Sequence, residues 1–146
     1  MIPWVHLATA VVPDDGGELR LMQRGTEFSI MAGAIELMSS RLSGSEKALA
    51  TLACERLKDR PKPHILIGGY GMGFTLRAAL ESLGPSAQVT VGELVPEIVD
   101  WARGPMAHVS GESLKDPRLT IAVGDVGDLI RSGRESYDAI LLDVDN

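Results

Sequence analysis

The first forty residues alternate short apolar runs with turn-forming residues. Runs of strand length occupy Leu7 to Val12, Glu18 to Arg24, Phe28 to Met31 and Ala34 to Met38. The connection between the first two runs reads Pro-Asp-Asp-Gly-Gly, which is typical of a hairpin. The pattern therefore predicts a small antiparallel β unit over residues 1–42. Such a unit buries little surface alone, so we expect it to pack on the rest of the chain or on another copy.

A helical pattern begins at Ser43. Ser43 is followed three residues later by Glu46, which fits a capping box, and apolar residues then recur at helical spacing up to Arg60 and Pro61. We predict a helix here that links the β unit to the rest of the chain.

Strands and helices alternate from His64 onward. The expected strands are His64 to Ile67, Gln88 to Gly92, Leu119 to Val123 and Ala139 to Leu142, and the expected helices are Phe74 to Leu83, Pro96 to Arg103 and Asp128 to Ser132. This alternation predicts an α/β domain over residues 43–146, with a Rossmann-like, doubly wound parallel sheet. The fourth strand would lie at an open edge, so we expect that C-terminal strands are missing or that a partner covers the edge.

Composition narrows the class of protein. The 146 residues suffice for one compact domain with a small extra unit, and 45% hydrophobic with 23% charged residues excludes a disordered chain. Fourteen basic against twenty acidic residues give a net charge of −6. This balance offers no basic face to a nucleic acid, so we expect no nucleic-acid partner.

The N-terminus, the apolar stretches and the cysteine and histidine residues bear on the location of the protein and on metal binding. The N-terminus lacks the basic segment of a signal peptide, and apolar stretches are shorter than the roughly 20 residues of a membrane helix. With the single cysteine, Cys54, these features predict a cytoplasmic protein without a membrane partner. His6, His64 and His108 show no ligand spacing with Cys54, so we expect no metal site.

A glycine-rich segment lies between the strand at His64 and the helix at Phe74, where doubly wound folds bind nucleotides. Its candidate binding residues are Gly68, Gly69, Gly71 and Gly73. The dinucleotide fingerprint would require glycine at the position of Phe74, whereas the G-x-G-x-G spacing is that of S-adenosylmethionine-binding folds. A glycine-rich turn without a ligand is the alternative.

Acidic residues follow three of the expected strands. Glu93 could accept hydrogen bonds from ribose hydroxyls, or could be a solvated acid at a strand end. Asp125 could accept from an adenine amino group or cap the next helix. Asp143 and Asp145 close the fourth strand and suit a cationic substrate, although one of them could cap a loop.

The segment from His64 to Asn146 resembles the polyamine aminopropyltransferases, the spermidine synthase family, and the β unit and linking helix are also similar to that family. The resemblance is carried by the glycine-rich segment, by Gly92-Glu93-Leu94-Val95-Pro96-Glu97, by Gly124-Asp125-Val126 and by Tyr137-Asp138-Ala139-Ile140-Leu141-Leu142-Asp143. It implies that the glycine-rich loop and Glu93 hold decarboxylated S-adenosylmethionine, and that Asp125 contacts adenine. It also implies that Asp143 orients or deprotonates the attacking amine.

The chain departs from the family pattern at several positions. The family loop reads G-G-G-D-G-G, whose acid falls on Gly71. The second acid of the fourth-strand motif would fall on Asn146, and here Asp145 precedes it. Acceptor-binding residues of the family, Asp-Glu-Phe and Tyr-His, are replaced by Arg41-Leu42-Ser43 and Ser45-Glu46. The chain therefore resembles a spermidine synthase-like branch more than a spermidine synthase.

Three functions remain open at this point. The first is transfer of an aminopropyl group from an adenosyl-sulfonium donor to an amine, with Asp143 and Asp145 as catalytic residues and no tightly bound cofactor. The second is a methyltransferase using intact S-adenosylmethionine, which the missing acid at Gly71 favours. The third is a non-catalytic protein that binds an adenosyl ligand or serves in assembly. In each case we expect a homo-oligomer.

Overall fold

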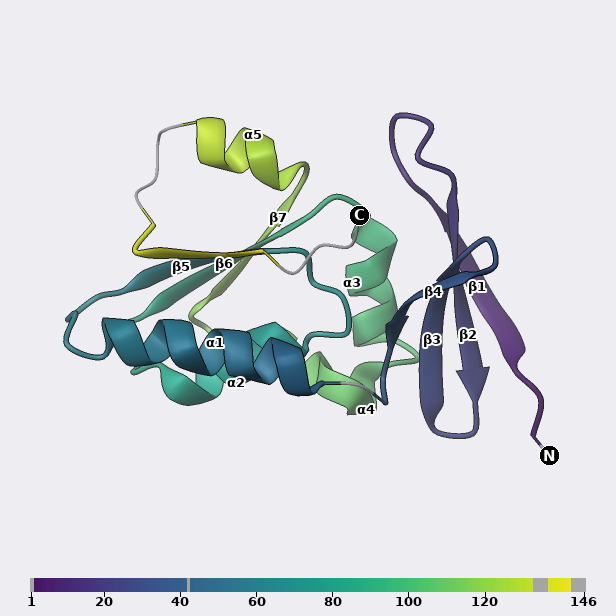
Figure 1. The fold of residues 1–146 in the computed structure, drawn as a ribbon, viewed down its shortest axis with the longest axis horizontal. Coiled ribbons are helices and arrows are strands. Elements are labelled where there is room, and N and C mark those ends of the chain that lie inside the picture. The colour runs from purple at the N-terminus through teal and green to yellow at the C-terminus, as the bar shows by residue number, and fades with distance from the viewer. Residues whose placement is uncertain (1, 42, 133–136, 143–146) are drawn as a thin grey trace.

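The described part of the chain forms two four-stranded sheets, one antiparallel and one parallel (Figure 1). The computed structural model describes residues 2–41, 43–132 and 137–142. The antiparallel sheet holds, in chain order, β1 (Val5–Val11), β2 (Glu18–Arg24), β3 (Glu27–Ala32) and β4 (Ile35–Ser39). The parallel sheet has the order β7 (Leu119–Val123), β6 (Gln88–Glu93), β5 (His64–Gly68) and β8 (Ala139–Leu142). The predicted fold class is confirmed, while the division at residue 42 stays a prediction.

The antiparallel sheet buries one face because its side chains alternate. Leu19 and Leu21 of β2 are buried, and Leu21 pairs with the equally buried Ile30 of β3. The β1–β2 connection contains Asp14 and Asp15 at φ 59°, a left-handed conformation that aspartate tolerates in turns. The turn residues seen in the sequence therefore do close this hairpin.

The linking helix α1 (Gly44–Leu57) forms where it was expected, but the capping-box prediction is wrong. Ser43 has φ −138° and ψ 0°, and its side chain makes no capping hydrogen bond. Glu46 instead accepts a hydrogen bond from the Ser45 hydroxyl at 3.2 Å. The helix α1 lacks a side-chain cap, and it is stabilised instead by packing on the neighbouring helix α2 (Phe74–Ser82) through buried residues such as Cys54.

The two faces of the parallel sheet are covered unequally (Figure 1). Helices α1 and α2 lie on one face, and among the described helices α5 (Val126–Arg131) alone lies over the other. No residue of α5 is buried. Ile140 and Leu142 of β8 are 41% and 56% exposed, and among the described residues β8 is an outer strand of its sheet. The expected edge position of β8 is confirmed.

The segment between β6 and β7 contains two short helices that the sequence analysis missed. The chain leaves β6 into α3 (Pro96–Arg103), continues through α4 (Ala107–Ser110), and then forms the 3-10 helix η1 (Gly111–Lys115). In Figure 1, α3 and α4 separate the parallel sheet from the antiparallel one. Four and five residues are too few to show a helical period, which is why α4 and η1 gave no signal.

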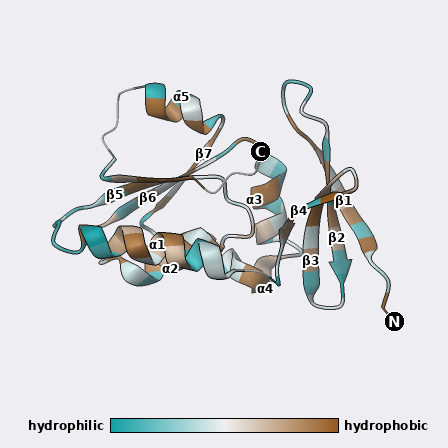
Figure 2. Ribbon diagram, viewed as in Figure 1, coloured by the Kyte–Doolittle hydropathy of each residue, from teal (hydrophilic) through white to brown (hydrophobic). Residues whose placement is uncertain are grey.

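Hydrophobic residues remain on parts of the surface (Figure 2). The strand β1 exposes Val5, Leu7 and Val11, the last of them to 67%. Along α1, hydrophobic and hydrophilic residues alternate in Figure 2, and Leu52 is 68% exposed. Within the described ranges, no helix is long and apolar enough to cross a membrane.

Candidate nucleotide-binding site

The glycine-rich loop joins β5 to α2 and needs glycine for its backbone conformation. Gly69, Gly71 and Gly73 have φ values of 92°, 58° and 83°. Gly73 is the N-cap of α2, and a Cβ there would lie against the hydroxyl groups of Ser110 and Tyr70. These glycines therefore satisfy a backbone requirement whether or not a ligand is bound.

Glu93, at the end of β6, is bound to the backbone of this loop. Its Oε1 accepts the N–H of Tyr70 at 2.8 Å, and its Oε2 accepts the N–H of Val95 at 3.0 Å. Residues 68 and 92 pair across the parallel strands, which brings the acid beside the loop. Glu93 is only 6% exposed, so the alternative of a solvated acid is wrong. Each carboxylate oxygen can accept a second hydrogen bond, so both can also receive a ligand hydroxyl.

A cavity of about 160 Å³ opens beside Glu93, at the C-terminal edge of the parallel strands. It is lined by Gly69, Gly92, Glu93, Leu94, Gly124, Asp125 and Val126. Three of the site residues predicted from the sequence, Gly69, Glu93 and Asp125, thus line one cavity. The cavity is below the roughly 300 Å³ of common small-molecule pockets, so a whole nucleoside donor would require it to widen.

Asp125 is the N-cap of α5. Its Oδ1 accepts the N–H of Gly127 at 2.6 Å, and the residue is exposed. This capping bond explains why α5 begins at Val126, two residues before the position expected from the sequence. The capping alternative is confirmed, and a contact between Asp125 and adenine stays a prediction.

The expected catalytic residues Asp143 and Asp145 lie outside the described residues. The described part of β8 ends at Leu142, which pairs with Gly68 at the start of the glycine-rich loop.

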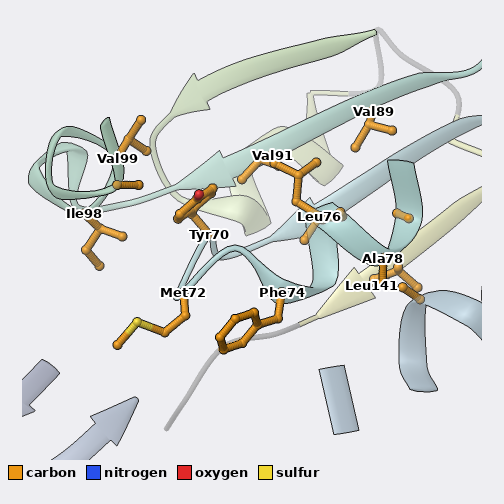
Figure 3. Packing of buried hydrophobic residues seen from close by; sticks show 14 of the residues in the cluster. Tyr70, Met72, Phe74, Leu76, Ala78, Val89, Val91, Ile98, Val99 and Leu141 are labelled. Carbon is orange, nitrogen blue, oxygen red and sulfur yellow. The ribbon is translucent and has the colours of Figure 1, made fainter. Parts of the chain in front are cut away.

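Tyr70 and Ser110 belong to this site, and the sequence analysis missed both. Tyr70 is 2% exposed, and in Figure 3 its ring lies among buried apolar side chains that include Val91 and Ile98. Its hydroxyl lies 3.4 Å from Ser110 Oγ, and Ser110 in turn donates to the carbonyl of Met72. Burial raises the pKa of the Tyr70 hydroxyl, so this group is a neutral hydrogen-bond donor. A tyrosine within a glycine-rich stretch was the one available signal.

Other candidate residues have structural roles. Trp101 is 6% exposed and belongs to the apolar core. Cys54 is buried against α2, and burial raises the pKa of its thiol. Among the described residues, no three His, Cys, Asp or Glu side chains gather as metal ligands would.

The chain is similar in sequence to polyamine aminopropyltransferases. It is 35% identical over 86 residues to the polyamine aminopropyltransferase of Korarchaeum cryptofilum, covering 59% of this chain and 26% of that protein. It is 32% identical over 133 residues to the polyamine aminopropyltransferase of Corynebacterium efficiens, covering 89% and 25%. The matches thus span about a quarter of the length of these relatives. No protein-family model matches the chain.

Solved structures agree with the sequence comparison. The spermidine synthase of Thermotoga maritima superposes with a TM-score of 0.76 at 18% identity, which shows a shared fold. The superposition covers 97% of this chain and 47% of that one, so it includes both sheets. In sequence and in fold, the chain therefore resembles the spermidine synthase-like family.

Proposed function

We propose that this protein is a spermidine synthase-like transferase that binds an adenosyl-sulfonium donor and transfers its aminopropyl group to an amine. The observation that carries the proposal is the Glu93 carboxylate, buried beside the glycine-rich loop and bound to the N–H groups of Tyr70 and Val95. A fixed acid at the end of the second parallel strand suits a ribose, because it can accept from both hydroxyls. Asp125, on the same cavity, would accept from the adenine amino group.

The proposed reaction is an in-line displacement. The lone pair of a neutral amine attacks the carbon beside the sulfonium, a C–N bond forms, and the C–S bond breaks to leave methylthioadenosine. The proton that the amine loses would pass to Asp143 or Asp145, an assignment that rests on the sequence pattern alone. Since the sulfonium is already a good leaving group, the enzyme would contribute chiefly by orienting the two reactants.

The donor could be decarboxylated or intact S-adenosylmethionine, and Gly71 bears on the choice. With no side chain at this position, the loop lacks the carboxylate that would attract the ammonium of an aminopropyl arm. The N-terminus of α2 has no side-chain cap, so its N–H groups and helix dipole would favour a carboxylate. This feature supports methyl transfer from intact S-adenosylmethionine as the second candidate function.

A non-catalytic protein that binds an adenosyl ligand or serves in assembly is the third candidate function. We expect self-association under all three candidate functions. The surface of β1 favours contact with another copy, because β1 is an outer strand of the antiparallel sheet and exposes Val5, Leu7 and Val11. An apolar strand at the edge of a sheet is a ready partner for another chain.

Isothermal titration calorimetry with four ligands tests the proposal: decarboxylated S-adenosylmethionine, S-adenosylmethionine, methylthioadenosine and NAD. We expect the three adenosyl-sulfur ligands to bind and NAD to bind far more weakly. Incubation of each donor with a panel of polyamines and diamines, followed by mass spectrometry, then separates aminopropyl transfer from methyl transfer and from binding alone. No binding of any adenosyl-sulfur ligand would overturn the proposal.

A further inference from the structure

A chain of hydrogen bonds runs beneath the glycine-rich loop. Ser110, the last residue of α4, donates its hydroxyl proton to the carbonyl of Met72 within the loop. The hydroxyl of Tyr70 lies 3.4 Å from Ser110 Oγ. Because a serine hydroxyl has only one proton, and Met72 receives it, Tyr70 must be the donor to Ser110. The order is therefore Tyr70 to Ser110 to Met72, and it crosses from the loop to α4 and back.

The helix α4 is held on the side of α2 and on the side of α3. Arg77 of α2 donates to the carbonyl of Val109 at 2.8 Å. Gly111, directly after Ser110, packs so closely that a Cβ there would come within 2.6 Å of the carbonyl oxygen of Ala102 in α3. The position of Ser110 is therefore fixed by contacts of its two sequence neighbours with α2 and α3.

The antiparallel sheet also contacts α4. The ring of His108 lies 5.4 Å from the ring of Phe28 in β3, measured between centroids. Residues two apart on a helix point to nearly opposite sides. His108 can therefore contact the antiparallel sheet while Ser110 contacts the glycine-rich loop.

Tyr70 connects this support to the ligand side of the loop. Its backbone N–H is the donor to Glu93, and its carbonyl accepts the N–H of Gly73 at 2.9 Å. Its side chain is buried, and its hydroxyl lies beside Ser110 Oγ. A shift of the ring would therefore turn the peptide group that holds the Glu93 carboxylate.

We infer that Ser110 and Tyr70 are positioning residues for donor binding, which they support by fixing the loop so that Glu93 is already oriented for the ribose. This inference rests on the proposed function and adds α4 to the machinery of the site. The Ser110 hydroxyl takes part in both hydrogen bonds of the chain, whereas the Tyr70 hydroxyl takes part in one, which is long at 3.4 Å. Removing the serine hydroxyl should therefore matter more than removing the tyrosine hydroxyl.

The test compares three single variants in the full chain: Ser110→Ala, Tyr70→Phe and the control Ser82→Ala. The Ser82 hydroxyl also donates to a backbone carbonyl, that of Ala78 at 2.9 Å, but near the far end of α2. Methylthioadenosine affinity is measured by calorimetry well below each melting temperature. We expect binding to weaken about five- to tenfold in Ser110→Ala, about two- to threefold in Tyr70→Phe, and not at all in Ser82→Ala.

Amide hydrogen exchange without ligand provides a second measurement. The N–H of Gly73 is bonded within the loop and the N–H of Tyr70 is bonded to Glu93 of β6, so both report the opening of the loop. Their exchange should accelerate in Ser110→Ala and remain at the wild-type rate in Ser82→Ala. A double variant that combines Ser110→Ala with Tyr70→Phe should lose less affinity than the product of the two single losses, because both hydroxyls act through one chain of bonds.

The outcomes separate the two proposals. If the wild type fails to bind methylthioadenosine while exchange still accelerates in Ser110→Ala, the proposed function fails and the support of the loop by Ser110 stands. If the wild type binds, and Ser110→Ala binds equally well with unchanged exchange, the positioning role is overturned. If Ser110→Ala does not fold, Ser110→Cys replaces it, because cysteine keeps a similar side-chain size with a weaker hydrogen-bond donor. The same criteria then apply, with an expected loss of affinity between those of the wild type and Ser110→Ala.

Discussion

The carboxylate of Glu93 accepts the backbone N–H of Tyr70 at 2.8 Å, which joins the end of β6 to the loop after β5. Glu93 thus has two tasks in the proposed site, because it closes the loop and faces the cavity. A change at this residue should affect both the loop and the ligand. Variants at position 93 must therefore separate the loss of charge from the loss of loop structure.

Replacing Glu93 should weaken binding of adenosyl ligands. We expect Glu93→Ala to cost about 1 to 3 kcal/mol, the size of hydrogen bonds to a charged group. Glu93→Gln keeps one acceptor for Tyr70 or Val95 and should retain more loop order than the alanine variant. Calorimetry with methylthioadenosine gives the loss of binding, and thermal melting without ligand gives the loss of stability. An unchanged affinity in Glu93→Ala would remove the ribose assignment.

Gly71 should determine how sharply the two donors are distinguished. Its φ of 58° lies in the left-handed region, which aspartate and asparagine adopt more readily than most residues, so Gly71→Asp adds a carboxylate with less strain than most substitutions there. We expect this substitution to shift the preference toward decarboxylated S-adenosylmethionine, because the new carboxylate attracts its aminopropyl ammonium and repels a donor carboxylate. Gly71→Asn is the matched neutral control. Titration of both donors against the three proteins measures the shift, and equal ratios in all three would contradict it.

Gly73 should tolerate no side chain. At φ 83°, a Cβ would lie against the hydroxyl groups of Tyr70 and Ser110, so Gly73→Ala should destabilise the fold by about 2 kcal/mol or more. Gly84 is the matched control, because a Cβ there meets nothing within 4 Å and its φ is not positive. Urea unfolding of both alanine variants gives the comparison. Equal losses of stability in Gly73→Ala and Gly84→Ala would contradict this prediction, because they would show that the residues around Gly73 can move to accommodate a methyl group.

The ion pair between Asp116 and Arg118 should make the free energy of unfolding depend on pH in the acidic range. Arg118 donates two side-chain hydrogen bonds to the Asp116 carboxylate and also reaches the carbonyl of Leu80 at the end of α2. The hydrogen bonds from Arg118 lower the pKa of Asp116 to about 2. Because the folded pKa lies below the unfolded one, the stabilisation is complete above about pH 4 and is lost as the pH falls toward 2.

Asp116→Asn removes this titration. We expect about 1 to 2 kcal/mol lower stability than wild type at pH 7, with the difference shrinking as the pH falls from 4 to 2. Urea unfolding at pH 7, 4 and 2.5 measures it. Asp128→Asn is the control, since Asp128 pairs with Arg131 but is largely exposed. A pH-independent difference between wild type and Asp116→Asn would contradict the assignment.

The exposed strand β1 should mediate self-association. We expect the wild type to associate in light scattering at high concentration, and Val11→Lys to weaken this association by placing a charge on an edge strand. Leu52→Lys is the matched control, because Leu52 is 68% exposed on α1 and Val11 is 67% exposed on β1. A monomeric wild type, or equal effects of the two lysines, would remove β1 as the contact surface.

Much of the fold could be predicted from local patterns. The strand at His64, the helix at Pro96 and the four short strands of the antiparallel sheet all appeared within a few residues of their expected bounds. The start of α5 was misplaced because the Asp125 side chain caps it, whereas α1 begins where it was expected although the Ser43 side chain does not cap it. The short helix α4 could not be seen, because four residues carry no period.

The sequence by itself determined the elements, their alternation and the place of the glycine-rich loop, because these follow from interactions between residues close together in the chain. Only the tertiary structure decided what individual side chains do. Glu93 meets Tyr70 across 23 positions of sequence, and Ser110 meets Met72 across 38. Such contacts exist only after the strands have paired in register and α3 has brought the chain back over the loop, and no local pattern carries that information.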